Sequence, residues 1–240
     1  MKSSTPIYRL KHHARRMARD QKIPLHAALD HIATGEGFRN WSHLSASDGQ
    51  LPEVGDLYAA LAPGDLVISA ARPGQGKTLL ALALAIEAMK AGRKALFFSL
   101  DYTAKDMIGR FRALNADPAA FGDRFGFDDA DCISAGYIIA RTGQAPAATL
   151  VIVDYLQLLD QRRENPDLMS QIRALRSFAL ELRITVICIS QVDRSYDPLR
   201  QAFPTLADVR LPNPLDLGLF DKACFLNNGK IRLEAITASP

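Results

Sequence analysis

Residues 70–78 read Ala-Ala-Arg-Pro-Gly-Gln-Gly-Lys-Thr, and this stretch decides the fold class of the 240-residue chain. An apolar, strand-like segment precedes it at 66–69, and a long apolar segment with helical character follows at 79–89. A glycine-rich turn between a strand and a helix is typical of a loop that holds phosphate groups with backbone N–H groups. The alternative is a turn rich in Gly and Pro with an incidental Gly-Lys-Thr, which the flanking segments disfavour.

Each part of this loop has a chemical role in holding a nucleoside triphosphate. The glycines allow backbone angles that other residues avoid, the lysine reaches the β- and γ-phosphates, and the threonine hydroxyl can bind Mg²⁺. The usual pattern, G-x-x-x-x-G-K-[ST], has a glycine where this chain has Ala71. The predicted nucleotide-binding residues are Arg72, Gly74, Gln75, Gly76, Lys77, Thr78 and Leu79.

The composition fits one main domain with a small addition, since 48% of the residues are apolar and can form one sizeable core. The longest apolar run, 79–86, is far shorter than the ~20 residues that span a bilayer. The basic N-terminus is not followed by a secretory apolar segment, so we expect a cytoplasmic protein without a membrane span. The three widely spaced cysteines fit neither a disulfide framework nor a metal cluster, and Cys188 is predicted to lie in the core.

The N-terminal part is predicted to be a small basic helical module at 1–46, joined by a linker around 45–55 to the main domain at 56–240. Residues 1–46 carry a net charge of +5 and the rest −2. This asymmetry fits either a contact with a polyanion or a solvated helical face, and both remain open. Apolar spacing predicts two helices, the second near Pro24 with Leu25 facing inward, and Trp41 as an aromatic of the module's core.

The main domain alternates strands and helices. Strands are predicted at 65–70, 94–100, 124–127, 149–154 and 184–190, and helices at 78–91, 103–114, 133–142 and 168–182. Alternating strands and helices of this length require crossover connections, so we predict an α/β fold with a doubly wound, mainly parallel sheet and helices on both faces. A C-terminal hairpin is expected around Asn228-Gly229.

Three strands end in polar residues that are predicted to meet the phosphate loop, because ligands bind at the carboxyl edge of such sheets. Asp154 ends the strand 149–154 and would bind Mg²⁺ together with Thr78. Asp101 is a candidate base or water-orienting group, Gln191 could sense the terminal phosphate, and Lys77 completes the predicted catalytic set.

Taken in order, the motifs resemble the ATPase domain of the DnaB-type replicative DNA helicases, within the RecA-like superfamily of P-loop NTPases. The resemblance rests on 70–73, 76–78, 98–101 (Phe-Ser-Leu-Asp), 127–129, 153–158 (Val-Asp-Tyr-Leu-Gln-Leu) and 190–195 (Ser-Gln-Val-Asp-Arg-Ser). It implies ATP and Mg²⁺ as cofactors, hydrolysis coupled to movement on single-stranded DNA, and a homo-oligomeric ring with sites between subunits.

This chain departs from the family pattern in ways that oppose a motor. Asp101 stands where the family has a glutamate, so slower hydrolysis is expected. The family's late Lys-x-Arg pair is missing before the Asn228-Gly229 turn, which argues against ring assembly. Lys230 and Arg232 have the spacing but follow the turn, so they are predicted to be strand surface residues.

Arginines in the loops after two strands are predicted to contact single-stranded DNA, although they could equally be solvated: Arg162, Arg163, Arg194 and Arg200. The leading hypothesis is therefore an ATP-binding, slowly hydrolysing protein similar to a replicative helicase. The alternative is a nucleotide-dependent regulator or assembly factor without unwinding activity, in which ATP shifts a conformation. An interaction module with a decayed site is disfavoured because Lys77, Thr78, Asp154 and Gln191 are present.

Overall fold

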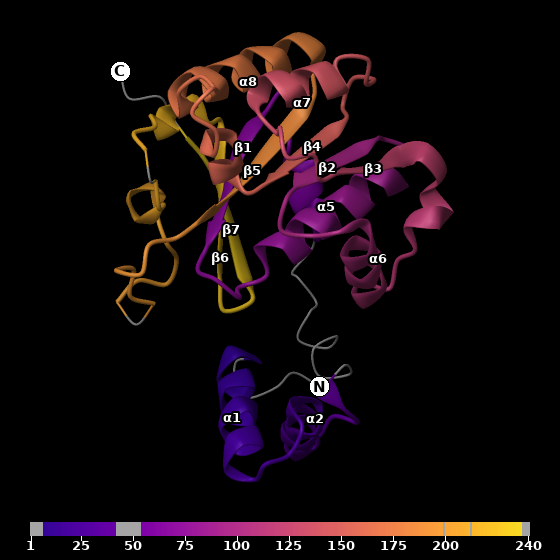
Figure 1. The fold of residues 1–240 in the computed structure, drawn as a ribbon, viewed down its shortest axis with the longest axis vertical. Helices are drawn as coiled ribbons and strands as arrows, with labels where there is room; N and C mark the ends of the chain where they lie inside the picture. The colour runs from indigo at the N-terminus through magenta and orange to yellow at the C-terminus, as the bar shows by residue number, and fades with distance from the viewer. Residues whose placement is uncertain (1–6, 42–53, 199, 212, 237–240) are drawn as a thin grey trace. The chain divides into compact units, whose positions relative to one another are not determined.

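The computed structural model describes residues 7–41, 54–198, 200–211 and 213–236 (Figure 1). The chain divides into two compact units, one with the N-terminal helices and one with the β-sheet and its surrounding helices. The predicted domain limits, 1–46 and 56–240, stay predictions. None of the helices in the described ranges is both long and apolar enough to cross a bilayer.

The N-terminal unit contains two helices, α1 (Ile7–Asp20) and α2 (Leu25–Gly35). Its core consists of Leu10, Ala33 and Phe38, and the half-buried Trp41 packs against them, as the sequence predicts. The expectation that Leu25 faces inward is wrong, since its side chain is 45% exposed. Leu25 is the first residue of α2, and the buried residues of this helix, Ala28 and Ala33, come later in it.

The second unit is built on a seven-stranded sheet with the order β3-β2-β4-β5-β1-β6-β7. Strands β1 to β6 pair in parallel, as predicted for an α/β fold with crossover connections. The observed strand ends differ from the predicted ones by at most one residue. The strands are β1 (Leu66–Ala71), β2 (Ala95–Ser99), β3 (Phe125–Asp128), β4 (Leu150–Asp154), β5 (Thr185–Gln191), β6 (Lys222–Asn227) and β7 (Lys230–Ala235).

Helices cover both faces of the sheet (Figure 1). Side chains of α7 and α8 share one core cluster with alternate residues of β1, β4 and β5, while α5 covers the opposite face. The helices are α4 (Val54–Ala59), α5 (Lys77–Lys90), α6 (Ala104–Ala113), α7 (Ala135–Thr142) and α8 (Leu168–Leu182). Helix α4 is a correction, because the linker was predicted to extend to Gly55 and the helix already begins at Val54.

Short 3-10 segments connect several elements: η1 (Pro118–Arg124), η2 (Leu156–Asp160), η3 (Leu206–Asp208) and η4 (Leu217–Leu219). The predicted hairpin joins β6 to β7 through Asn228 (φ 51°) and Gly229 (φ 73°). Positive φ at both turn residues matches the twist of the flanking strands, and Asn-Gly tolerates it best.

The register of the sheet brings the predicted site residues to one edge and one face. Ser99 on β2 is level with Asp154 on β4, and Asp154 is level with Ile189 on β5. Ala71, at the end of β1, is level with Gln191. Neighbours in register point to the same side of a parallel sheet, so Ser99, Asp154 and Gln191 share the face that α5 covers.

Candidate nucleotide site

The phosphate loop connects β1 to α5 and depends on two glycines in left-handed conformations. Gly74 has φ 79° and Gly76 has φ 88°. A Cβ at either position would meet no atom within 4 Å, so backbone conformation rather than space requires glycine here. Gly76 caps α5 without a side-chain hydrogen bond, which leaves the first-turn N–H groups free of a competing side-chain acceptor. Such a helix start attracts anions.

Lys77 folds back onto this loop. Its Nζ donates to the carbonyl oxygens of Ala71 (3.1 Å) and Arg72 (3.3 Å). Burial lowers the pKa of Lys77, and the charge of Asp154 opposes this change. Two neutral carbonyls are weaker partners for a buried ammonium group than phosphate oxygens, so the lysine is placed to bind an anion in the loop.

Thr78 and Asp154 form the second half of the site. The Thr78 hydroxyl donates to Asp154 Oδ2 at 2.8 Å, and Asp154 is only 4% exposed. Burial raises the pKa of Asp154 to about 6, although the Thr78 hydrogen bond acts in the opposite direction. A buried carboxylate next to a hydroxyl fits the oxygen ligands that Mg²⁺ prefers. Within the described ranges no cluster of three His, Cys, Asp or Glu side chains could hold a metal, so phosphate and water would complete the shell.

Asp101 follows β2 at the same edge. Its side chain is exposed, and its backbone N–H donates to Ser99 Oγ at 3.1 Å. Ser99, two residues before Asp101, is level with Asp154 in the sheet, so both carboxyls lie at the same edge. The structure thus brings the candidate base near the candidate metal ligand, as predicted from the strand ends.

A cavity of about 440 Å³ lies beside the phosphate loop. Its lining residues are Pro73, Gln191, Val192, Asp193, Arg194 and Arg210. Arg210 was not predicted. It reaches this position because its N–H donates to the Gln191 carbonyl at 2.7 Å and Val209 bridges to Val192 in an antiparallel pair. The cavity therefore joins the phosphate loop to two arginines.

Two further residues lie beside the candidate metal ligands Thr78 and Asp154 and were also not predicted. The hydroxyl oxygen of Tyr102 is 3.4 Å from Thr78 Oγ1, and the guanidinium carbon of Arg110 is 4.0 Å from the centre of the Tyr102 ring. The position of Tyr102 directly after Asp101 was the available signal for the tyrosine. The arginine comes from α6, two turns into the next helix, where the sequence alone gives no indication.

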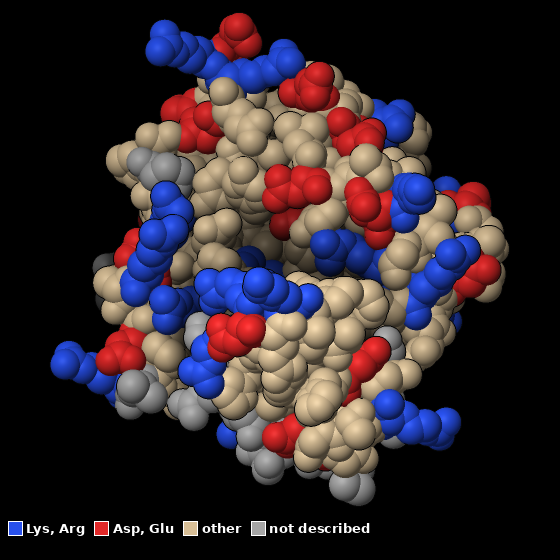
Figure 2. All heavy atoms as spheres, turned by 60° about the horizontal axis from the view of Figure 1, so that its bottom comes forward, with Lys and Arg blue, Asp and Glu red and all other residues tan. Residues whose placement is uncertain are grey.

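The four arginines predicted to contact DNA are all exposed. Arg200 is 89% exposed in its side chain and forms a loose ion pair with Asp197 at 3.6 Å. Arg194 lines the cavity, whereas Arg162 and Arg163 follow η2. Figure 2 shows Lys and Arg interspersed with Asp and Glu over the face that it presents. Exposure alone therefore does not separate a DNA contact from a solvated arginine.

Arg232 is held within its own chain. Its guanidinium donates to the Pro204 carbonyl at 2.7 Å, pairs with Glu234 at 3.2 Å and lies over the rings of Phe203 and Phe225. The prediction of a simple surface residue is thus incomplete, because Arg232 is partly buried. These contacts tie the side chain to the segment before η3 and to β6.

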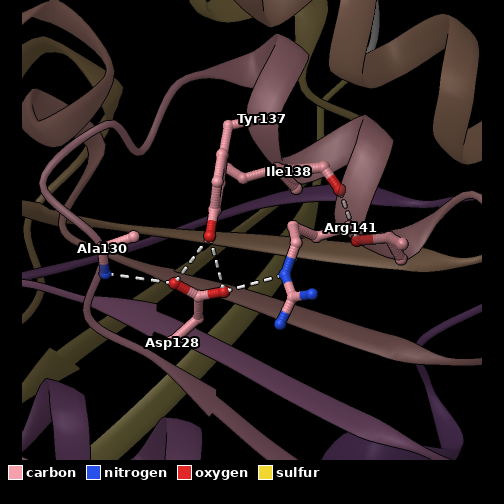
Figure 3. A network of polar contacts seen from close by, with 6 residues as sticks. Asp128, Ala130, Tyr137, Ile138 and Arg141 are labelled. Atoms are coloured by element: carbon pink, nitrogen blue, oxygen red, sulfur yellow. Dashed lines mark hydrogen bonds and ion pairs between the residues drawn. The ribbon is translucent and has the colours of Figure 1, made fainter.

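Asp128, from the 127–129 motif, has a structural role (Figure 3). Its carboxylate accepts hydrogen bonds from Ala130 N (3.1 Å), from the Tyr137 hydroxyl (3.0 and 3.2 Å) and from Arg141 Nε (3.1 Å). The network ties the end of β3 to α7. The motif therefore stabilises the fold at the sheet edge away from the phosphate loop.

Comparison with known proteins points to one family. The sequence profile of the family described as "DnaB-like helicase C terminal domain" matches residues 49–118 and 126–214. A probable plasmid replicative DNA helicase of Chlamydia trachomatis is 29% identical over 189 residues, which cover 66% of this chain and 42% of the relative. Replicative DNA helicase DnaB of Geobacillus stearothermophilus is 28% identical over 190 residues, with the same coverage. The chain thus spans about four-tenths of the length of these relatives.

Solved structures share the fold. One of them, described as an ATPase domain, superimposes with a TM-score of 0.54 at 24% identity, covering 68% of this chain and 69% of that one. A DnaB-like replicative helicase studied with primase gives a TM-score of 0.57 at 21% identity, covering 91% and 65%. The RecA-like fold expected from the sequence is confirmed by these neighbours.

Proposed function

The chain belongs to the DnaB-like helicase C-terminal domain family, and from this premise we propose that it binds Mg-ATP and hydrolyses it slowly. The observation that carries the proposal is the 2.8 Å hydrogen bond between Thr78 and the buried Asp154. This pair lies next to the glycine-rich loop, on which Lys77 donates to the Ala71 carbonyl. The loop and Lys77 would hold the phosphates, and Thr78 and Asp154 would hold Mg²⁺, which neutralises charge on the β- and γ-phosphates.

Slow turnover follows from the remaining side chains. Asp101 would orient or deprotonate the attacking water, but its carboxyl is one methylene shorter than that of a glutamate. The strand β6 lacks the Lys-x-Arg pair of the family pattern, and an arginine finger is worth about three to five decades of rate. A homo-oligomer remains part of the proposal, to be measured by sedimentation with and without nucleotide.

We further propose single-stranded DNA as the polymer that this protein contacts. The relatives are named replicative DNA helicases, and Arg194 and Arg210 line the cavity beside the phosphate loop. Arg162 and Arg163 extend from the loop after β4, at the same sheet edge.

The test is ATP turnover with and without single-stranded DNA. We expect turnover to rise when DNA binds. The logarithm of the DNA-binding constant should fall with the logarithm of the salt concentration, with a slope of about −0.7 per neutralised phosphate. Arg162→Ala/Arg163→Ala should weaken both binding and stimulation, whereas Lys90→Ala, at the far end of α5, should change neither. Absence of DNA binding at low salt would contradict the DNA proposal and leave ATP binding to be judged separately.

The second candidate is a nucleotide-dependent regulator in which ATP is a ligand rather than a fuel. It is favoured by β6, whose residues Ala223, Cys224, Phe225 and Leu226 are buried and carry no Lys-x-Arg pair. Tight Mg-ATP binding without measurable hydrolysis, with or without DNA, would select this candidate.

A further inference from the structure

Tyr102 and Arg110 form a half-buried pair next to the metal-binding residues. The guanidinium lies 4.0 Å from the ring centre, within the range of a cation–π contact, and the ring hydroxyl lies 3.4 Å from Thr78 Oγ1. Stacking on a ring face uses none of the five N–H donors of the guanidinium. Among the described residues, Arg110 forms no ion pair with a carboxylate.

The arginine is held on a rigid support. Helix α6 begins with a capping box, in which Asp106 N–H donates to Thr103 Oγ1 and the Thr103 N–H donates back to the Asp106 carboxylate at 2.9 Å. One helical face is anchored by the buried Met107 and Phe111, on either side of Arg110 in the sequence. The backbone of Arg110 is therefore held in place, and the Tyr102 ring supports its guanidinium.

The guanidinium lies beside the candidate metal site. It stacks on the ring of Tyr102, whose hydroxyl is 3.4 Å from Thr78 Oγ1, the oxygen that donates to Asp154. A Mg²⁺ ion held by Thr78 and Asp154 would neutralise charge on the phosphates of a bound nucleotide. A cation beside the metal ligands, on the side of Tyr102 and Asp101, therefore lies where the terminal phosphate and its attacking water would be.

We propose that Arg110, supported by the ring of Tyr102, binds the terminal phosphate of the nucleotide from within the same chain. This inference rests on the proposed function. It makes Arg110 the residue that distinguishes a triphosphate from a diphosphate, because only the triphosphate places an anionic group next to its free N–H donors. Guanidinium groups bind phosphate oxygens with paired, charge-assisted hydrogen bonds.

The experiment compares Mg-ATP and Mg-ADP affinity by calorimetry for the wild-type chain, Arg110→Ala and Arg112→Ala. Arg112 is an exposed arginine on the same helix and serves as the matched control. Losing a hydrogen bond to a charged group costs roughly a 10- to 100-fold change in affinity. We expect that loss for Mg-ATP with Arg110→Ala, nearly unchanged Mg-ADP affinity, and no change with Arg112→Ala.

The ring contact is tested by Tyr102→Phe, Tyr102→Leu and the Tyr102→Leu/Arg110→Ala double variant. Tyr102→Phe keeps the ring and should retain the preference for ATP, while Tyr102→Leu should lose part of it. The double variant should lose no more Mg-ATP affinity than Arg110→Ala, because both changes disrupt the same Tyr102–Arg110 pair.

Circular dichroism and thermal unfolding establish that the variants are folded. Equal weakening of ATP and ADP by Arg110→Ala, or the same loss with Arg112→Ala, would overturn the assignment. A wild-type chain that binds neither nucleotide would overturn the proposed function and this inference with it. Wild-type binding with unchanged Arg110→Ala affinities would overturn the inference alone.

Discussion

Replacing Asp154 by asparagine should stabilise the nucleotide-free protein at alkaline pH while it abolishes Mg²⁺ binding. The carboxyl is 4% exposed, and burial is the main reason that its pKa rises to about 6 from 3.8. Asparagine has nearly the same shape, carries no charge and keeps an oxygen that can accept the hydrogen bond from Thr78. The substitution therefore isolates the cost of the buried charge.

The magnitude follows from the pKa change. Since each pKa unit corresponds to about 1.4 kcal/mol, the ionised Asp154 lowers the free energy of unfolding by about 3 kcal/mol at most. A carboxyl whose pKa is raised on folding stabilises the native state below its unfolded pKa, and this contribution is lost as the pH rises through about 6. The variant should therefore exceed the wild type by about 1–3 kcal/mol at pH 8 and approach it at pH 4.

The assay is urea unfolding in EDTA at pH 4, 6 and 8, with equal m-values as the control for an unchanged unfolded state. In a domain of this size the gain corresponds to about 2–4 °C in Tm per kcal/mol. Saturating Mg-ATP should cancel or reverse this difference, because ligand at about 100 times its Kd adds about 2.7 kcal/mol to the wild type alone. An asparagine variant less stable than the wild type at pH 8 in EDTA would refute this account of Asp154.

Three other substitutions test separate parts of the account. Asp101→Glu should preserve or raise single-turnover ATP hydrolysis, since general-base positioning is typically worth ~10²–10⁴ in rate; a fall with normal ATP binding would show that Asp101 acts otherwise. Thr103→Ala removes the capping box of α6 and should cost about 1 kcal/mol in urea unfolding, with the exposed Lys105→Ala as its control. Phe111→Ala should cost about 3–5 kcal/mol, because Phe111 is fully buried with its ring 4.7 Å from that of Phe125; a cost below 1 kcal/mol would contradict this packing.

The sheet was predictable because its signals are local. Parallel strands covered on both faces form apolar runs, as β5 does, and each run ends where polar residues reach the carboxyl edge. Asp154 and Gln191 could therefore be placed at the phosphate loop from their positions at strand ends alone. The Asn228-Gly229 turn was equally predictable from the sequence, since positive φ values at both positions favour those residue types.

The remaining site residues depend on long-range contacts that leave no local pattern. Arg210 reaches the cavity because the chain returns to pair Val209 with Val192 after an irregular segment. The approach of Arg110 to Tyr102 depends on the rotation of α6, which its buried residues set against the sheet. The motif at 127–129 supported the resemblance to the family, but nothing in the sequence indicated the hydrogen bonds by which Asp128 anchors α7.

The central claim is that the loop at 70–78 binds Mg-ATP through Lys77, and calorimetric titration of the wild type and Lys77→Ala tests it most directly. The ammonium group is partly desolvated and bonded only to backbone carbonyls, so its removal should leave the unfolding curve nearly unchanged. The account predicts saturable Mg-ATP binding by the wild type and none by the folded variant. A wild type that binds no Mg-ATP, or a folded Lys77→Ala protein that binds it with unchanged affinity, would contradict the account.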